Sequence, residues 1–169
     1  DNKRNTTNPR TKILYADSST SETTNANIKV DFLSNGFQLT GTDTDYNGSG
    51  RTYIYMAFAA DPSSSAPVLP DSFANKLYTG NGGTQSITGL GFQPDFVWLK
   101  SSSATWGNFL QDSIRGAENF LISESSAAQG TTVPAIVDSF DTDGFTVLAN
   151  GNSNELNTTY VSWTWKANS

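Results

Sequence analysis

The sequence contains no cysteine and no histidine, and the two absences exclude whole classes of chemistry. Zinc fingers, haem or iron–sulfur ligation by these side chains, Ser-His-Asp and Cys-His triads, and disulfide bonds are all ruled out. Without cysteine, the redox compartment of the protein cannot be inferred either.

Long apolar runs and positive charges are also scarce. No stretch of 18 or more apolar residues occurs, and the first residues, DNKR, lack the apolar core of a signal peptide. We therefore expect no membrane insertion, and a chain that is processed or belongs to something longer. Ten Lys and Arg oppose sixteen Asp and Glu, which gives a net charge of −6. Such an acidic chain is a poor partner for nucleic acid, and we expect no nucleic-acid binding.

Hydroxylic and aromatic residues dominate what is present. Serine and threonine make up about a quarter of the chain, and aromatic residues reach 12% although all hydrophobic residues amount to only 36%. This composition is typical of many short strands joined by polar turns.

A period of two residues recurs along the chain and predicts strands. The clearest case is residues 161–166, VSWTWK, where apolar residues alternate with Ser, Thr and Lys. No helical pattern stands out, so the sequence predicts an all-β fold, an antiparallel β-sandwich of jelly-roll-like type. The other predicted strands are residues 12–15, 29–33, 37–40, 53–58, 73–78, 85–88, 96–101, 119–123, 136–140 and 144–148.

An internal repeat organises these strands. Residues 32–39, FLSNGFQL, match residues 140–147, FDTDGFTV, and residues 53–58, YIYMAF, match residues 160–165, YVSWTW. The first copy lacks the segment that precedes the second, so the chain is expected to contain one and a half repeats of a strand-rich module. The predicted parts are a flexible segment (1–11), the closing half of a module (12–60), a Pro/Ser linker (61–72) and a complete β-sandwich module (73–169).

Two dipeptides predict hairpin turns within the repeat. Asn35-Gly36 and Asp143-Gly144 lie between strand-forming runs, where glycine commonly supplies a positive φ. We therefore expect both glycines in the left-handed region.

Asp43, Asp45 and Asn47 have the spacing that opens an EF-hand loop, followed by glycine. Position 12 of such a loop would be Ile54 rather than the usual Glu, and no helices are predicted to flank it. Two interpretations stay open, a weak Ca²⁺ site and a polar hairpin tip. No other cofactor is expected.

Four tryptophans invite a carbohydrate-binding hypothesis, because sugar rings stack on indole faces. Strand alternation assigns Trp163 and Trp165 to one face with Val161, and we expect that face to be the core. Trp106 lies in a polar segment without alternation and is the best candidate for an exposed contact residue, with Asn108 beside it.

Carboxylates offer little support for catalysis. Asp141 and Asp143 are predicted to share a strand face, yet an aspartate in a turn commonly accepts backbone hydrogen bonds. A glycosidase requires two carboxylates at a defined separation, and no short motif here predicts one. We identify no catalytic residues and expect a protein that is not an enzyme.

Five ordered motifs resemble a domain of unknown function that recurs in tail-fibre-like structural proteins of tailed bacteriophages, especially marine ones. They are residues 77–85 (LYTGNGGTQ), 89–100 (GLGFQPDFVWLK), 112–116 (DSIRG), 139–145 (SFDTDGF) and 160–166 (YVSWTWK). The resemblance covers residues 73–167 and, in part, 12–62. It implies a setting on the virion surface or at host attachment, and it brings no catalytic residues. Asp112 and Arg115 in the third motif are expected to form an ion pair that fixes a turn.

These observations favour a structural and adhesive module of a phage virion that is extracellular or on the particle surface. Its expected partners are further copies of itself or other virion proteins. The half module, residues 12–60, is expected either to pair with the complete module in one sandwich or to complete a neighbouring subunit by strand addition. A lectin-type domain that binds host glycans is the main alternative, and a lectin-fold glycanase is the third.

Overall fold

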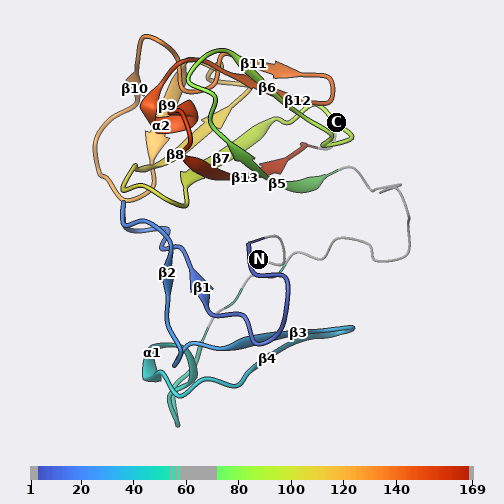
Figure 1. Ribbon diagram of the computed structural model, residues 1–169, viewed down its shortest axis with the longest axis vertical. Coiled ribbons are helices and arrows are strands. Elements are labelled where there is room, and N and C mark those ends of the chain that lie inside the picture. The colour runs from blue at the N-terminus through green and yellow to red at the C-terminus, as the bar shows by residue number, and fades with distance from the viewer. Residues whose placement is uncertain (1–3, 54, 56, 58–71, 168–169) are drawn as a thin grey trace. The chain divides into compact units, whose positions relative to one another are not determined.

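The computed structural model describes residues 4–53, 55, 57 and 72–167, which fall into two compact units (Figure 1). Unit 1 is formed by Asp1–Leu14 and Glu22–Phe58, and unit 2 by Tyr15–Ser21 and Ala59–Ser169. A short stretch of the N-terminal region thus belongs to the same unit as the C-terminal residues.

Unit 2 contains two antiparallel sheets. The larger has six strands in the order β10-β9-β8-β7-β13-β5, and the smaller has three in the order β11-β12-β6. The strands are β5 (Phe73–Thr79), β6 (Gln85–Thr88), β7 (Phe96–Ser101), β8 (Asn108–Asp112), β9 (Asn119–Ile122), β10 (Gly130–Thr131), β11 (Ser139–Asp141), β12 (Gly144–Val147) and β13 (Thr159–Trp165).

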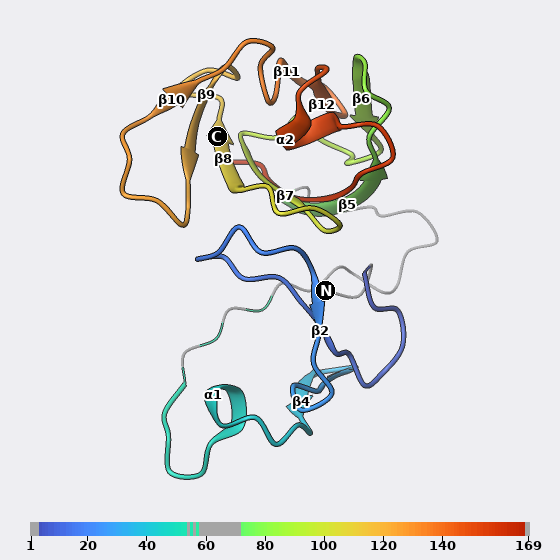
Figure 2. The same cartoon turned by 60° about the vertical axis from the view of Figure 1, so that its left-hand side comes forward.

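The hydrophobic core of unit 2 lies between these sheets, and Figure 2 shows β6 and β12 over the β5–β7 side of the larger sheet. Val97 and Leu99 of β7 and Phe145 and Val147 of β12 belong to one core cluster, and all four are fully buried. Alternation explains this arrangement, because every second residue of each strand faces the opposite sheet. The prediction of an all-β antiparallel sandwich is confirmed.

Unit 1 is smaller and is built from two hairpins and one helical turn. Strands β1 (Lys12–Ile13) and β2 (Thr23–Thr24) form one antiparallel pair, and β3 (Val30–Leu33) and β4 (Gly36–Leu39) form the other. The single turn α1 (Thr44–Asn47) follows β4, as α2 (Gly151–Asn154) follows β12 in unit 2.

The two hairpins that contain the repeated sequence have the same register. Phe32 pairs with Phe37 in unit 1, and Phe140 pairs with Phe145 in unit 2. In both hairpins the strands are joined by two residues, since β3 ends at Leu33 and β4 begins at Gly36. The matched sequences therefore adopt the same local structure.

A tyrosine fixes the helical turn after each of these hairpins. The Tyr53 hydroxyl donates to Thr44 O at 2.8 Å and accepts from Gly48 N at 2.7 Å. The Tyr160 hydroxyl likewise donates to Gly151 O at 2.6 Å and accepts from Glu155 N at 3.0 Å. Each tyrosine thus closes the backbone of its turn by the same pair of contacts, whereas the extension of this likeness to a whole repeated module stays a prediction.

The predicted role of the two hairpin glycines is wrong. Gly36 and Gly144 are the first residues of their second strands, and the five glycines with positive φ among the described residues lie elsewhere. The turn positions are occupied by Ser34-Asn35 and Thr142-Asp143. Gly144 instead allows a close approach, because a Cβ there would lie 1.9 Å from Ile87 O.

Most predicted strands agree with the structure to within three residues, and β2, β8 and β10 were not foreseen. Residues 4–11 are tied to unit 1 rather than frayed, since Arg10 and Val30 exchange backbone hydrogen bonds and Asn8 binds Phe32. The predicted linker lies almost entirely outside the described residues, as do Ile54, Met56 and Phe58 of the predicted strand 53–58.

Candidate functional site

Asn108, predicted to contact a glycan, is buried at the start of β8 with only 2% of its surface exposed. Its Oδ1 accepts from Trp98 Nε1 at 3.2 Å, and its Nδ2 donates to the carbonyls of Tyr15 at 3.2 Å and Ser18 at 3.0 Å. The hydrogen-bonding groups of this amide are therefore used within unit 2, and Asn108 is not exposed in the described structure.

Lys100 on β7 lies beside Asn108 and is fully buried. Its Nζ donates to Ser19 O at 3.0 Å and to Trp106 O at 2.5 Å. Burial lowers the pKa of this ammonium from its ordinary value, and the negative charge of Glu124 acts in the opposite direction. Two carbonyl acceptors compensate for the burial of the amine, which makes Lys100 an anchor for the main chain.

Lys100, Asn108 and Ser123, named here the docking cluster, hold residues 15–19 by their backbone. Ser123, which follows β9, donates through Oγ to Ala16 O. All the contacts of the cluster to this segment go to carbonyl oxygens, which every residue type provides. The cluster can therefore bind an extended chain with little demand on its side chains. A lysine on the same face as Trp98 was the one signal in the sequence that could have indicated this site.

Trp106 lies between β7 and β8 and is partly exposed. Its Nε1 donates to Glu155 Oε2 at 3.2 Å, and a Cβ at Gly151 would lie 3.5 Å from its ring. The indole thus covers α2, and the structure does not bring Trp106 and Asn108 together as one exposed pair.

Aromatic side chains also line the outer face of the six-stranded sheet. Trp98 and Trp163 have ring centroids 5.8 Å apart, and Trp165 contacts Phe96 at 5.3 Å and Phe73 at 5.1 Å. All five are partly buried and lie outside the core between the sheets.

The alternation predicted for residues 161–166 is right, but Trp163 and Trp165 do not belong to the core as expected, although Val161 on the same face is fully buried. Tyr160 belongs to the core between the sheets, and Ser162 and Thr164, on the same side of β13, are also fully buried. Trp163 and Trp165 occupy the opposite face. Periodicity separates two faces of a strand, whereas it does not reveal which of them meets the second sheet.

The candidate calcium residues have protein partners in unit 1. Asp43 caps α1, accepting from Asp45 N at 2.9 Å, while Asp45 faces Arg51 at 3.5 Å and Asn47 Nδ2 donates to Gly41 O at 3.0 Å. Within the described residues, no group of three or more Asp or Glu side chains is arranged to hold a metal ion. The calcium hypothesis stays a prediction, and melting the protein with Ca²⁺ and then with EGTA tests it: an unchanged Tm would end it.

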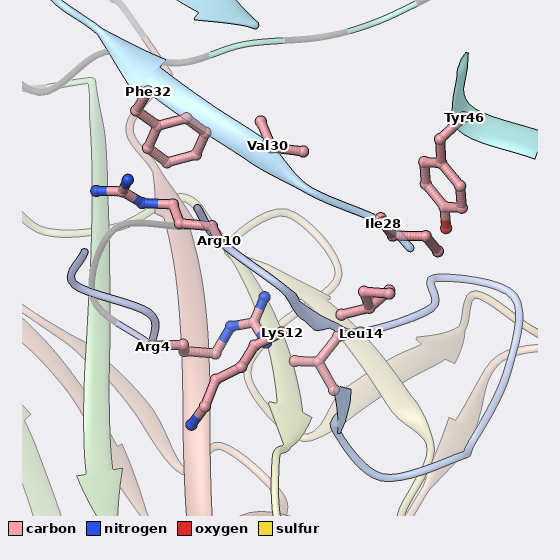
Figure 3. Close-up of a pocket in the computed structure, with 9 residues that line it drawn as sticks. Arg4, Arg10, Lys12, Leu14, Ile28, Val30, Phe32 and Tyr46 are labelled. Atoms are coloured by element: carbon pink, nitrogen blue, oxygen red, sulfur yellow. The ribbon is translucent and has the colours of Figure 1, made fainter. Parts of the chain in front are cut away.

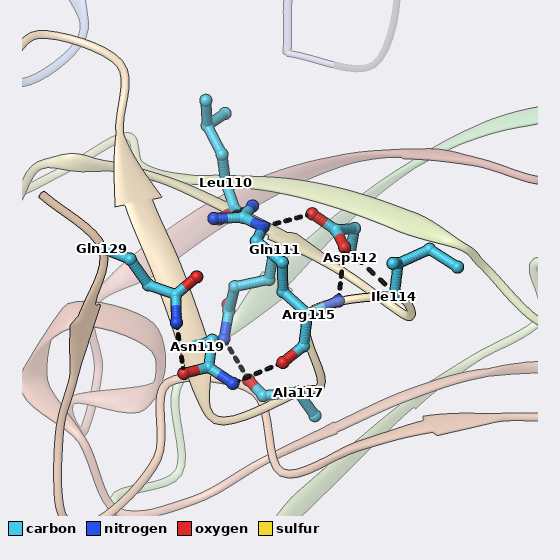
Figure 4. Close-up of polar contacts among 8 residues, drawn as sticks. All are labelled: Leu110, Gln111, Asp112, Ile114, Arg115, Ala117, Asn119 and Gln129. Carbon is cyan, nitrogen blue, oxygen red and sulfur yellow. Dashed lines mark hydrogen bonds and ion pairs between the residues drawn. The ribbon is translucent and has the colours of Figure 1, made fainter.

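Asp112 and Arg115 form the expected ion pair at a turn after β8 (Figure 4). Arg115 Nε lies 2.6 Å from Asp112 Oδ2, and Asp112 Oδ1 accepts from the backbone N–H groups of Ile114 and Arg115. Partial burial acts to raise the pKa of Asp112, but the hydrogen bonds and charge of Arg115 outweigh it and lower this pKa. Arg115 also donates to Leu110 O, so the pair fixes the turn.

Asp143 and Asp141 are also hydrogen-bonded within unit 2. Asp143 accepts from Gly91 N at 2.7 Å and Gly89 N at 3.0 Å, and these hydrogen bonds lower its pKa. Asp141 accepts from Ser139 Oγ and Thr146 Oγ1, both at 2.8 Å. The contacts of Asp143 agree with the turn role expected of it, whereas Asp141 accepts from side-chain hydroxyl groups rather than from backbone N–H groups.

A pocket of about 220 Å³ opens in unit 1 (Figure 3). Its apolar lining includes Ile28 and Val30, and the Arg10 guanidinium lies 4.4 Å from the centre of the Phe32 ring. Lys12 contributes a charge at the rim but pairs with Glu22 at 3.0 Å. The pocket is a mainly apolar depression, and sequence analysis did not foresee it.

Further findings concern membrane-spanning segments and family membership. Among the described residues, no helix is long and apolar enough to cross a membrane. The sequence model of a family described as "Domain of unknown function (DUF7483)" matches residues 1–62 and 70–169. The protein is thus an all-β chain that belongs to this family. No curated protein and no solved structure matches the chain significantly.

Proposed function

We propose that this protein is a non-enzymatic structural and adhesive module of a bacteriophage virion, which acts through its β-rich surface. The observation that carries the proposal is the docking cluster, where two buried side chains, Lys100 and Asn108, and the exposed Ser123 hold a distant chain segment by its carbonyls. Groups that could have served a ligand are thus used to join parts of the chain. The resemblance of the five ordered motifs to tail-fibre-like proteins supports the virion setting.

Self-association is the first property that this proposal requires. We expect light scattering coupled to size exclusion to give a mass that is a multiple of 18.2 kDa. A mass of one chain at every concentration would contradict an assembly role. Detection of the protein by mass spectrometry in purified phage particles tests the virion setting separately, and its absence from them would contradict that setting.

A lectin-type role is the second candidate, and the aromatic row on the outer sheet face favours it. Partly exposed Trp98 and Trp163 could stack on sugar rings, as could Trp106. A glycan array with the intact chain, Trp106→Ala and Trp163→Ala tests this role. Glycan binding that is lost in one tryptophan variant would support it, and an absence of binding by the intact chain would exclude it for the glycans on the array.

A further inference from the structure

One edge of β4 in unit 1 is unpaired in the described structure, although the matching edge in unit 2 is covered. Strand β12 lies between β11 and β6, whereas β4 pairs with β3 alone. The two hairpins share their register, so the free edge of β4 corresponds to the edge of β12 that binds β6. Unpaired strand edges are sites at which another strand can add.

The glycine at the start of β4 points to a missing neighbour. Gly144 is crowded by β6, because a Cβ there would lie 1.9 Å from Ile87 O. Gly36 holds the equivalent position, yet a Cβ there would meet no described atom within 4 Å. Gly36 does not have a positive φ either. Neither turn geometry nor crowding within the described chain therefore requires glycine at position 36, whereas an incoming strand would.

The side chains beside this edge also have room to contact an added strand. Phe145 is fully buried opposite Ile87, while its counterpart Phe37 is only partly buried. Asp143 binds the N–H groups of Gly89 and Gly91 in the loop after β6. Its counterpart Asn35 is exposed and offers an amide oxygen that can accept one such hydrogen bond.

We propose that the free edge of β4 binds an extended peptide segment of the β6 type. Its occupant has an aliphatic β-branched residue opposite Phe37. The backbone of the occupant packs closely against Gly36, where no side chain lies in between, and a Gly-x-Gly sequence after its strand reaches Asn35. In unit 2 these positions are occupied by Ile87, Thr88 and residues 89–91, GLG. The inference rests on the proposed structural role. It names a binding site and a partner through which that role would be performed.

The test uses the full chain and a fluorescent peptide with the sequence of residues 83–93, GTQSITGLGFQ. We expect saturable binding by anisotropy and NMR shift changes at the amides of residues 36–39. Gly36→Val should abolish saturable binding up to about 1 mM peptide, the weak limit of specific association. The Tm of the Gly36→Val variant should not change, because a Cβ at this position would meet no described atom within 4 Å.

Matched controls separate this site from others. Ser34→Val adds a similar bulk at the exposed turn, and its counterpart Thr142 does not pair with β6, so binding should persist. A peptide with Asp in place of Ile87 should not bind, because its charge would face Phe37. If the peptide binds Gly36→Val and the intact chain with equal affinity, it has bound at another position, for instance in place of β6. That result would overturn the proposal.

Peptide binding and oligomeric mass, measured on the same chain, distinguish the strand site from the proposed structural role. A chain that assembles but does not bind the peptide overturns the strand site and leaves the structural role. A chain that binds the peptide at Gly36 yet is monomeric at every concentration overturns the assembly role and leaves the site.

Discussion

Gly144 shows at the residue scale why a small side chain can be required in the middle of a sheet. A Cβ at this position would collide with Ile87 O, which is backbone and cannot rotate away. We expect Gly144→Ala to lower the free energy of unfolding by about 1–3 kcal/mol, the usual range for overpacking. Urea unfolding measures the change.

Gly36→Ala is the matched control for this prediction. The same methyl group enters the equivalent hairpin position, where no described atom lies within 4 Å. We expect its free energy of unfolding to stay within about 0.5 kcal/mol of the intact chain. Equal losses in both variants would show that the cost comes from the strand backbone rather than from contact with β6.

Tyr78 is a buried tyrosine whose ionisation couples folding to alkaline pH. Burial, followed by the nearby Tyr160, raises its pKa well above 10.0, and its hydroxyl donates to Ser153 O at 2.6 Å. Between pH 10.0 and the raised pKa, the unfolded tyrosine has lost its proton while the folded one keeps it. The unfolded state then binds fewer protons, so stability falls as pH rises through this range.

Tyr78→Phe should therefore weaken the loss of stability between about pH 8 and about pH 11. At the lower pH the variant should be less stable by about 1 kcal/mol, because Ser153 O loses its donor. Lys100 titrates in both proteins and cancels in the comparison. Tyr55→Phe, at a side chain that is 73% exposed, is the control and should leave the pH dependence as it is. An unchanged slope in Tyr78→Phe would contradict the assignment.

At the scale of elements, the docking cluster joins β7, β8 and the end of β9 to residues 15–19. We expect Asn108→Ala to lower the free energy of unfolding by about 1–3 kcal/mol, because it leaves the partly buried indole N–H of Trp98 and two carbonyls without their partner. Hydrogen exchange should become faster in the amides of residues 15–21. Asn152→Ala, the same truncation in α2, should not change exchange in this segment.

Strands and hairpins were predictable because their signal is local. Alternation and the paired Phe positions fix where β4, β12 and β13 begin and end to within a few residues. The choice of face on β13 was not predictable, since it depends on which side the second sheet covers. Ser162 and Thr164 fill the inner side, and Trp163 the outer one.

The candidate site was predictable only in part. Asp112 and Arg115 lie three residues apart, so their pairing could be foreseen from the sequence. The contacts of Asn108 with Tyr15 and Ser18 span about ninety residues, and a single polar residue in the sequence gives no sign of such partners. Burial of Lys100 depends on the same distant segment.

At the scale of the whole molecule, residues 15–21 make unit 2 dependent on the N-terminal region. Deleting residues 1–62 should leave a folded β-sandwich with a lower Tm, because Lys100, Asn108 and Ser123 lose their carbonyl acceptors. Circular dichroism measures both properties. Adding a peptide of residues 14–22 should restore part of the lost Tm. If the truncated chain without peptide has the same Tm as the intact chain, the dependence is refuted.

The division of the chain has a consequence for a nicked protein. The backbone passes from one unit to the other after Leu14, after Ser21 and after Phe58. A protease site engineered into residues 59–71 would cut only the last of these passages. The N-terminal piece would still contain Tyr15–Ser21, which is part of unit 2. The two pieces should therefore co-elute under native conditions and separate in denaturant, so that the protein behaves as a natural fragment-complementation pair.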